Sequence, residues 1–307
     1  KKLQIGPVWR GEKPQKGRYR EFYQCDLDII GVDSEAADIE ILGAFQSILS
    51  DMDVGPFTMR IGNRGMLSHV IKECMPSVDE AGTKAVLIAI DKLEKIGTDK
   101  VVNLMVENIT GATEGGARLL IKKVTGNPFE AVPADQPDLQ RFKSTIDCLN
   151  KMADISGKGT IKADLSIARG LAYYTGVVFE TVLDDLPNFG SICSGGRYND
   201  LASRFSSREL PGVGGSIGLD RLLACLEESN LIESDSIEDL QGFIAQIERC
   251  RDNDDCPRQT LKAIQSILPP INEIVNAYQS DRTIALLPQI ELYIPKSKKW
   301  PYSSPMR

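Results

Sequence analysis

Hydrophobic and polar residues alternate over residues 21–31, and this pattern predicts a β-strand. One face of the strand would carry Tyr23, Cys25, Leu27 and Ile29, and the other Phe22, Gln24, Asp26 and Asp28. A helix is expected next, because hydrophobic residues recur at helical spacing over residues 41–52 before Gly55 and Pro56 end the pattern. Residues 56–61 predict a second strand, which the turn-like residues 62–65 would close.

The pattern becomes helical with charged faces from about residue 66 to residue 159, for example over residues 85–96. Strand character returns over residues 162–167 and 173–183, where aromatic and β-branched residues are dense. Glycines then cluster before a helix that would carry Ile217, Leu222, Leu223 and Leu226. We therefore expect four segments, namely a core over 1–65, a helical insertion over 66–160, a second core segment over 161–229, and a C-terminal extension of unknown fold over 230–307.

Composition is that of a globular protein, with 307 residues, 42% of them hydrophobic. No apolar run approaches the roughly 18 residues needed to span a membrane, and residues 1–10 lack the apolar stretch of a signal peptide. We therefore expect a cytoplasmic protein that does not bind membranes. The seven cysteines are scattered and favour reduced, buried thiols. With no CxxC motif and His69 as the only histidine, we expect no metal-ligating residues.

A basic run at residues 10–20, RGEKPQKGRYR, contrasts with the net charge of −7. The simplest interpretation of such a run is a solvated loop. Alternatively, the loop would join two strands and project arginines over the polar face that carries Gln24 and Asp28, which lie roughly 13 Å apart at strand rise. Since the planar fork of arginine binds phosphate through paired, charge-assisted hydrogen bonds, this arrangement suits a nucleotide-like ligand beside a small cationic one.

Three segments resemble motifs of one enzyme family. Residues 9–22, WRGEKPQKGRYREF, resemble motif 2 of class II aminoacyl-tRNA synthetases in the form found in histidyl-tRNA synthetases. Residues 169–176, RGLAYYTG, resemble the histidine-specific motif of that family, and residues 212–222, GVGGSIGLDRL, are similar to motif 3. With the linking strands, the resemblance covers roughly residues 1–229. It implies an α+β fold, in which helices flank the antiparallel sheet of the class II synthetases and a helical insertion interrupts the core.

The resemblance implies an ATP site built mainly from arginines. Arg10 would hold the α-phosphate, with Arg169 on its opposite side doing work that a metal does elsewhere. Glu12 would contact the adenine amino group, and Arg18 would lie near the phosphates. Arg221 would pack on adenine and reach the γ-phosphate. Mg²⁺ would accompany ATP, held mostly by phosphate and water.

The same resemblance implies a histidine site and a reaction. Gln24 and Asp28 would bind the α-amino group of histidine, and Tyr174, with Tyr173 behind it, would read the imidazole. The carboxylate of histidine would attack the α-phosphorus of ATP, and Arg10 and Arg169 would stabilise the charge that develops. The histidyl group would then pass to tRNA(His), and the full domain would form a homodimer.

Several of these residues also fit simpler interpretations. The glycines of residues 212–218 do not form a dinucleotide fingerprint, because a GxGxxG pattern would need glycine where Ile217 stands. Without the resemblance, Tyr173 and Tyr174 would be assigned to cross-strand packing, and Arg169 to the surface. The acidic run at residues 251–255 lacks the residues of a calcium loop, and His69 has no expected function.

The chain departs from the family pattern in several places. Ala172 stands where the family usually has Asp, and Asp28 stands where many members have Glu. Because the chain begins almost at motif 2, we expect motif 1, which builds the class II dimer interface, to lie outside it. Residues from Leu231 onward lack the βαβ pattern of the family's anticodon-binding domain.

Two other functions stay open from the sequence. One is a regulatory subunit of ATP phosphoribosyltransferase, a synthetase-like protein of histidine biosynthesis that binds histidine without aminoacylation. Such a paralogue has no reason to keep the ATP arginines, and all four are present here: Arg10, Arg18, Arg169 and Arg221. The other is a non-catalytic interaction domain. A histidine–tRNA ligase is the function that the sequence favours.

Overall fold

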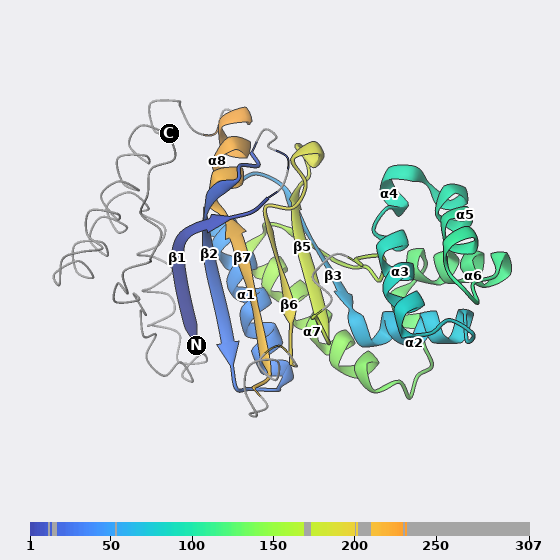
Figure 1. The fold of residues 1–307 in the computed structure, drawn as a ribbon. Coiled ribbons are helices and arrows are strands. Elements are labelled where there is room, and N and C mark those ends of the chain that lie inside the picture. The colour runs from blue at the N-terminus through green and yellow to red at the C-terminus, as the bar shows by residue number, and fades with distance from the viewer. Residues whose placement is uncertain are drawn as a thin grey trace, which may run out of the picture.

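The chain folds around one seven-stranded sheet (Figure 1). This computed structural model describes residues 1–11, 13, 17–52, 54–168, 173–199, 201, 210–229 and 231. The strands are β1 Lys2–Trp9, β2 Glu21–Ile30, β3 Phe57–Asn63, β4 Thr160–Ala163, β5 Val177–Leu183, β6 Cys193–Arg197 and β7 Gly212–Gly218.

The order of strands across the sheet is β1-β2-β7-β6-β5-β3-β4. Every neighbouring pair is antiparallel except β3 and β4, which run parallel. The predicted α+β class with an antiparallel sheet is therefore confirmed, with one parallel pair at the edge. Strands far apart in sequence meet at the centre, because β2 pairs with β7.

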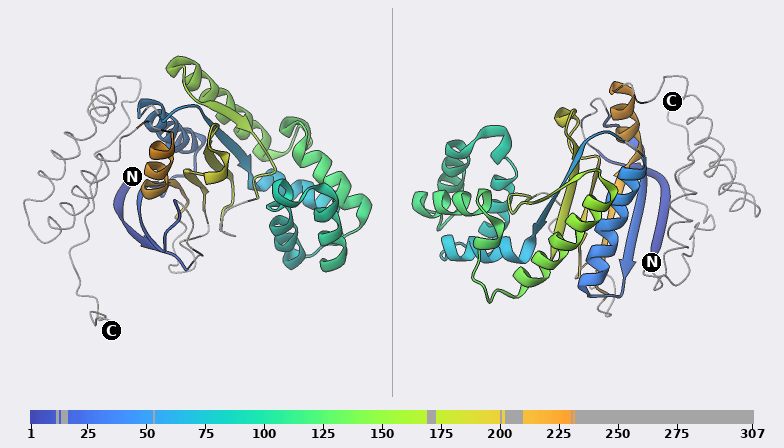
Figure 2. Two further views of the ribbon diagram at one scale, coloured as in Figure 1. Left: turned by 90° about the horizontal axis from the view of Figure 1, so that it is seen from above. Right: turned by 180° about the vertical axis from the view of Figure 1, so that it is seen from behind.

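Helices cover the back of the sheet and extend beyond one end of it. Figure 2 shows α1 and α7 lying across the back, while α2 to α6 gather beyond β3. The helices are α1 Glu35–Asp51, α2 Arg64–Cys74, α3 Glu80–Ile90, α4 Leu93–Ile96, α5 Thr98–Asn108, α6 Glu114–Thr125, α7 Pro137–Ser156 and α8 Leu219–Glu228. Short 3₁₀ turns lie at Pro128–Glu130 and Pro187–Phe189.

Helix α1 is set by its cap and its buried face. The Ser34 side chain accepts a hydrogen bond from the amide of Ala37 at 3.2 Å, which satisfies one free N–H of the first turn. Phe45 is buried under the sheet and its ring lies 5.4 Å from that of Phe179 on β5. Helix α1 therefore packs against the back of the sheet near its centre.

The alternation of β2 directs its polar side chains to the front of the sheet. Ile29 is buried, and Cys25 and Leu27 pack against the hydrophobic core that α1 shares. Gln24 and Asp28 therefore point to the opposite, front side, as the sequence pattern predicts.

Several predicted boundaries are wrong. The helix expected over residues 85–96 breaks at Asp91 and Lys92, because a turn there lets Leu93 and Ile96 pack partly against the core. The strand expected over residues 162–167 ends at Ala163. The Asp164 carboxylate accepts from the amide of Ser166 at 2.9 Å and turns the chain.

Three further expectations also need correction. The strand expected from residue 173 begins at Val177, since Tyr173 and Tyr174 lie in a cleft and not in the sheet ladder. Residues 62–65 are not a turn: β3 runs to Asn63, whose side chain caps α2 by accepting from the amide of Met66. Ile217 belongs to β7 and not to the helix that follows.

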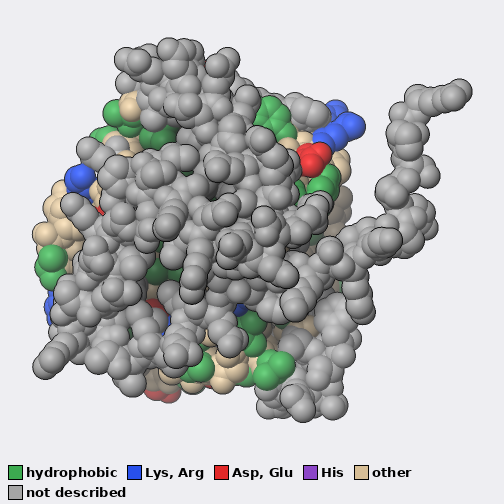
Figure 3. Space-filling view, turned by 90° about the vertical axis from the view of Figure 1, so that its left-hand side faces the viewer, with side chains coloured by type: hydrophobic (Ala, Val, Ile, Leu, Met, Phe, Trp, Pro, Cys, Tyr) green, Lys and Arg blue, Asp and Glu red, His purple; other side chains and the backbone are tan. Residues whose placement is uncertain are grey.

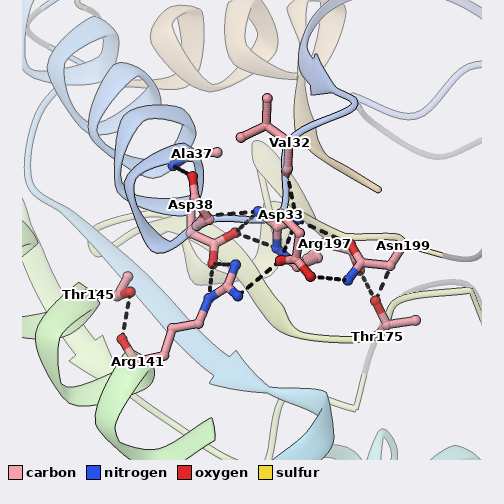
Figure 4. A network of polar contacts seen from close by, with 10 residues as sticks. Val32, Asp33, Ala37, Asp38, Arg141, Thr145, Thr175, Arg197 and Asn199 are labelled. Carbon is pink, nitrogen blue, oxygen red and sulfur yellow. Dashed lines mark hydrogen bonds and ion pairs between the residues drawn. The ribbon is translucent and has the colours of Figure 1, made fainter. Parts of the chain in front are cut away.

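A buried ionic network ties the back helices to the end of β6 (Figure 4). Asp38 of α1 accepts from Arg197 Nε at 2.7 Å and from Arg141 Nε of α7 at 2.8 Å. Asp38 and Arg197 are each only 2% exposed. The Arg197 guanidinium also donates to the carbonyl oxygens of Val32 and Ser34, both at 3.2 Å. One carboxylate thus holds two arginines from different elements.

The cysteines of the described residues are free thiols: Cys74, Cys193 and Cys225 are buried as expected, whereas Cys25 and Cys148 are half-buried. Cys250 and Cys256 lie outside those residues. No helix of the described segments is both long and apolar enough to cross a membrane. On the β1 side of the molecule, seen in Figure 3, hydrophobic side chains of described residues lie at the surface beside charged ones. Trp9, which is 65% exposed, and Ile5, at 39%, belong to this edge strand.

Replacement of the central carboxylate tests the ionic network. We expect Asp38→Asn to lower the free energy of unfolding by about 3–5 kcal/mol, because it leaves buried arginine charge uncompensated. Urea denaturation followed by circular dichroism measures this change. Glu80→Gln removes an exposed carboxylate from its 2.8 Å pair with Lys84 and should leave the midpoint unchanged. Equal midpoints for the Asp38 variant and the unmodified protein would contradict the assigned role.

Candidate functional site

A cleft of about 1110 Å³ lies on the front of the sheet. It is lined by residues of β2, β5, β6, β7 and α8, by Arg10 and residues 17–19 between β1 and β2, and by residues of α2, α3 and α4. Arg10, Arg18, Gln24, Tyr173, Tyr174 and Arg221 all line it. The structure thus brings together six of the nine site residues that the sequence predicts.

One end of the cleft is formed by the strands that carry motif 2. Arg10 follows β1 directly and its guanidinium carbon lies 5.0 Å from the centre of the Phe22 ring on β2. A terminal guanidinium nitrogen of Arg10 lies 3.5 Å from the Gln24 side-chain oxygen. The antiparallel register of β1 and β2 produces this contact, because the amide of Arg10 also donates to the carbonyl of Arg20 at 2.8 Å.

Arg221 approaches the same end from the first turn of α8. Its Nε lies 3.4 Å from the carbonyl oxygen of Gly17, and a terminal nitrogen donates to the carbonyl oxygen of Ser191. Gly17 has φ of +67°, a conformation that favours glycine, and so turns the loop towards Arg221. Arg18, the next residue, is half-buried and also lines the cleft.

An aromatic group lies deeper on the front of the sheet. The rings of Tyr173 and Tyr174 meet edge to face with centroids 4.6 Å apart, and Tyr198 meets Tyr173 edge to face at 6.1 Å. The hydroxyl of Tyr198 donates a hydrogen bond to the carboxylate of Asp28. Burial, followed by this hydrogen bond, raises the pKa of the Tyr198 hydroxyl, while burial and then Tyr173 raise the pKa of Tyr174. The phenols of Tyr174 and Tyr198 are therefore neutral hydrogen-bonding groups near pH 7.

Asp28 is a carboxylate in partly desolvated surroundings. Burial raises its pKa above the ordinary value, the Tyr198 hydrogen bond and Lys2 oppose the shift, and neighbouring Asp26 adds to it. One carboxylate oxygen of Asp26 is buried without a hydrogen-bond partner. The front of β2 therefore holds two carboxylates that favour a cationic or N–H-donating ligand.

Glycines of β6 and β7 make room for these side chains. A methyl group on Gly196 would come within 2.9 Å of a ring carbon of Tyr174, and one on Gly214 would overlap the Asp28 carboxylate. Glycines are frequent in this part of the sequence because the side chains of Tyr174 and Asp28 lie too close to the backbone of β6 and β7 to leave room for a Cβ atom.

The charge that lines the cleft is positive although the chain is acidic. Six lysines and arginines face three acids, and the acids are Asp91, Glu180 and Asp220. Glu180 pairs with Arg60 at 3.1 Å, and Asp220 accepts from the amide of Tyr23 at 2.6 Å. Such a lining suits an anionic ligand.

Sequence comparison agrees with this geometry. The family profile described as histidyl-tRNA synthetase matches residues 3–222. This chain belongs to the histidyl-tRNA synthetase family. A histidine–tRNA ligase of Rhodopirellula baltica is 45% identical over 236 residues, which are 74% of this chain and 53% of the relative. One of Treponema denticola is 41% identical over 245 residues, with shares of 74% and 52%. The chain thus spans about half the length of the curated relatives it matches.

Solved structures of the histidyl-tRNA synthetase family share the fold. The crystal structure of histidyl-tRNA synthetase from Nostoc sp. PCC 7120 is 30% identical, with a TM-score of 0.64 over 75% of this chain and 55% of that one. An ATP phosphoribosyltransferase regulatory subunit/histidyl-tRNA synthetase from Bacillus halodurans is 22% identical, with a TM-score of 0.59 over 73% of this chain and 58% of that one. This second likeness shows a common fold alone.

Three predicted residues of the histidyl-tRNA synthetase motifs remain. Asp28 adjoins the aromatic group through Tyr198, while Glu12 and Arg169 lie outside the described residues. Ala172 and nearly all of residues 230–307 also lie outside them.

Sequence reasoning missed Tyr198, Phe22 and the α3–α4 wall of the cleft. The run Gly195-Gly196-Arg197-Tyr198 holds the only available clue to Tyr198, because an arginine and a tyrosine directly follow two glycines. No pattern connects Tyr198 to Asp28, which lies 170 residues earlier.

Removal of the Tyr198 hydroxyl should raise the pKa of Asp28 further, because the lost hydrogen bond favours the ionised carboxylate. Carboxyl ¹³C NMR titration of Tyr198→Phe and of the unmodified protein measures the shift. An acid with a raised folded-state pKa stabilises the fold at low pH and loses that contribution as pH rises through this pKa. The loss should therefore move to higher pH in the variant.

Tyr19→Phe is the matched control, since Tyr19 is 49% exposed and makes no described contact with Asp28. If the pKa of Asp28 is the same in Tyr198→Phe as in the unmodified protein, the Tyr198 hydroxyl does not hydrogen-bond to the Asp28 carboxylate in solution.

Proposed function

We propose that this chain carries the amino-acid-activating site of a histidine–tRNA ligase. One observation carries the proposal: a single cleft joins Arg10, Arg18 and Arg221 to the aromatic group that surrounds Asp28. Phosphate-binding arginines at one end and N–H-accepting groups at the other suit ATP and histidine side by side. Membership of the histidyl-tRNA synthetase family supports the same pair of substrates.

The proposed first step is electrostatic catalysis. A carboxylate oxygen of histidine attacks the α-phosphorus of ATP, the bond from that phosphorus to the bridging oxygen breaks, and pyrophosphate leaves. Negative charge that builds on the α-phosphate meets Arg10, which β1 and the Phe22 ring hold in place. No side-chain base is needed, because the nucleophile is already ionised. Arg169 would assist from the opposite side, as the family motif implies.

The orientation of histidine follows from the positions of Gln24 and Asp28. Gln24 lies beside Arg10, whereas Asp28 lies against Tyr198 in the aromatic group. We therefore assign the α-amino group of histidine to Gln24, and the imidazole to Asp28 and Tyr174. This revises the expectation that both Gln24 and Asp28 bind the amino group. A carboxylate suits an imidazole N–H, and neutral tyrosine hydroxyls complete the polar edge of the ring.

Arg18 and Arg221 complete the proposed nucleotide site. Arg221 would pack on adenine opposite Phe22 and reach the γ-phosphate, Arg18 would lie near the phosphates, and Glu12 would contact the adenine amino group. Among the described residues, no group of three His, Cys, Asp or Glu could hold a metal ion. Mg²⁺ would therefore arrive with ATP and be bound chiefly by phosphate and water oxygens.

The second proposed step transfers the histidyl group to tRNA(His). The relatives from Rhodopirellula baltica and Treponema denticola are histidine–tRNA ligases, which supports this acceptor. Homodimer formation and a cytoplasmic location belong to the same proposal, since both are expected of a histidyl-tRNA synthetase.

Histidine-dependent exchange of ³²P-pyrophosphate into ATP tests the proposed activity. It is measured for the chain alone and for the chain extended by the segment that precedes the matched region in the Rhodopirellula baltica relative. We expect clear exchange from the extended protein, weak or no exchange from the chain alone, and none when another amino acid replaces histidine. Histidine binding without exchange in the extended protein would instead indicate a regulatory subunit.

Arg221→Gln in the extended protein should reduce exchange by roughly 10²-fold or more, because a preset cation is lost from the phosphate end. Arg118→Gln is the matched control. Arg118 lies on α6, is 49% exposed and pairs with Glu114 at 2.9 Å. Its replacement should leave exchange unchanged. Equal exchange rates for the two variants would remove Arg221 from the nucleotide site.

A further inference from the structure

Arg64 is a cation of the cleft that the proposed activation step does not use. It is the first residue of α2, and its amide donates to the carbonyl oxygen of Gly176 at 2.7 Å. This bond fixes the start of α2 beside the segment that carries Tyr174. The Arg64 side chain lines the cleft there, at the β3 end of the sheet.

The surroundings of Arg64 differ from those of Arg60, four residues earlier. Burial acts to lower the pKa of Arg60, but carboxylates, Asp164 first, outweigh it and raise the pKa. Asp164 lies 2.8 Å from Arg60, and Glu94 lies at 2.6 Å. For Arg64, burial alone lowers the pKa of the guanidinium, and no carboxylate of the described residues pairs with it. A half-buried cation without a carboxylate is costly unless an anion from outside binds there.

Two more cations lie at this end of the cleft. Lys84 of α3 and Lys95 of α4 line the wall that faces the sheet. Asp91 lines the same wall, and Lys84 pairs with exposed Glu80 at 2.8 Å. Arg64 is half-buried whereas Lys84 and Lys95 are exposed, so the charge of Arg64 is the least screened by water.

The Arg64 end of the cleft and the motif 2 arginines lie on opposite sides of the central strand β6. Four strand-to-strand steps separate β2 from β3 in the sheet, which is roughly 19 Å at the usual spacing. Arg10 follows β1, the strand beyond β2, and Arg221 lies above Gly17 of the same loop. A second anionic group is therefore needed to explain Arg64.

We propose that Arg64 binds a backbone phosphate of the single-stranded 3′ end of the tRNA. This inference rests on the proposed histidine–tRNA ligase function. In the transfer step the terminal ribose must reach the histidyl carbonyl beside Gln24 and Arg10, so the nucleotides before it must cross the remaining open part of the cleft. That part is the end bounded by Arg64, Lys84 and Lys95. Arginine binds a phosphodiester through its planar fork without reading the base.

Equilibrium binding to the full 307-residue chain tests the proposal. One probe is a fluorescent RNA minihelix with a single-stranded CCA end, and the other is histidyl-sulfamoyl-adenosine, a stable analogue of the adenylate. We expect Arg64→Gln to weaken RNA binding about tenfold or more and to leave analogue binding within about twofold. The slope of log K against log salt should fall by about 0.7, the value for one lost contact to single-stranded phosphate.

Lys72→Gln is the matched control, because this substitution removes one positive charge from an exposed position on the same helix. It should leave RNA affinity unchanged, and Arg64→Lys should restore part of it. The melting temperature of Arg64→Gln should equal or exceed that of the unmodified protein, since a desolvated charge has been removed.

Three results would overturn the proposal. A marked fall in the melting temperature of Arg64→Gln would make Arg64 structural. An equal loss of analogue affinity would place the adenylate phosphate, and not RNA, at Arg64. Unchanged RNA affinity and salt slope would remove Arg64 from the RNA path. If the chain extended as above binds the minihelix but not the analogue, the proposed histidine–ATP site fails, independently of Arg64.

Discussion

The ion pair between Asp38 and Arg197 connects the back of the sheet to the cleft on its front. Arg197 ends β6, and the next residue, Tyr198, reaches forward to Asp28. The carbonyl oxygen of Arg197 accepts from the amide of Thr175 at 2.8 Å, and the Thr175 hydroxyl accepts from the amide of Asn199 at 3.1 Å (Figure 4). The two segments that carry Tyr174 and Tyr198 are thus both held in place at Arg197. Helices that never touch a ligand therefore determine where the aromatic side chains lie.

The arginines of the described residues have two different electrostatic environments. Arg60, Arg141 and Arg197 are neutralised by nearby carboxylates and hold the fold together. The arginines that line the cleft face few acids, so local potential is positive in a chain of net charge −7. Binding of anions depends on this local separation, since the whole-molecule charge would repel them.

Much of the core can be predicted from local pattern. The alternation over residues 21–31 predicts both β2 and its polar front, because strand geometry alone assigns side chains to faces. The motif resemblance predicts that Arg10, Arg18 and Arg221 belong to one site, and they do line one cleft. Helix α1 follows from its periodic hydrophobic residues and the cap at Ser34.

Features that depend on close approach between distant segments could not be predicted. The contact of Tyr198 with Asp28 depends on β7 lying between β2 and β6, and no local signal specifies that order. The glycines that admit Tyr174 and Asp28 look like flexible turns in the sequence, yet they lie in strands. The helix break near Asp91 arises from packing of Leu93 against the core, which overrides the periodic pattern.

A crystal structure of the chain with histidyl-sulfamoyl-adenosine would test the central claim most directly. The account predicts the imidazole between Asp28 and Tyr174, the amino group at Gln24, and the sulfamoyl group at Arg10. An analogue bound elsewhere, or bound with its imidazole towards Arg10, would contradict it.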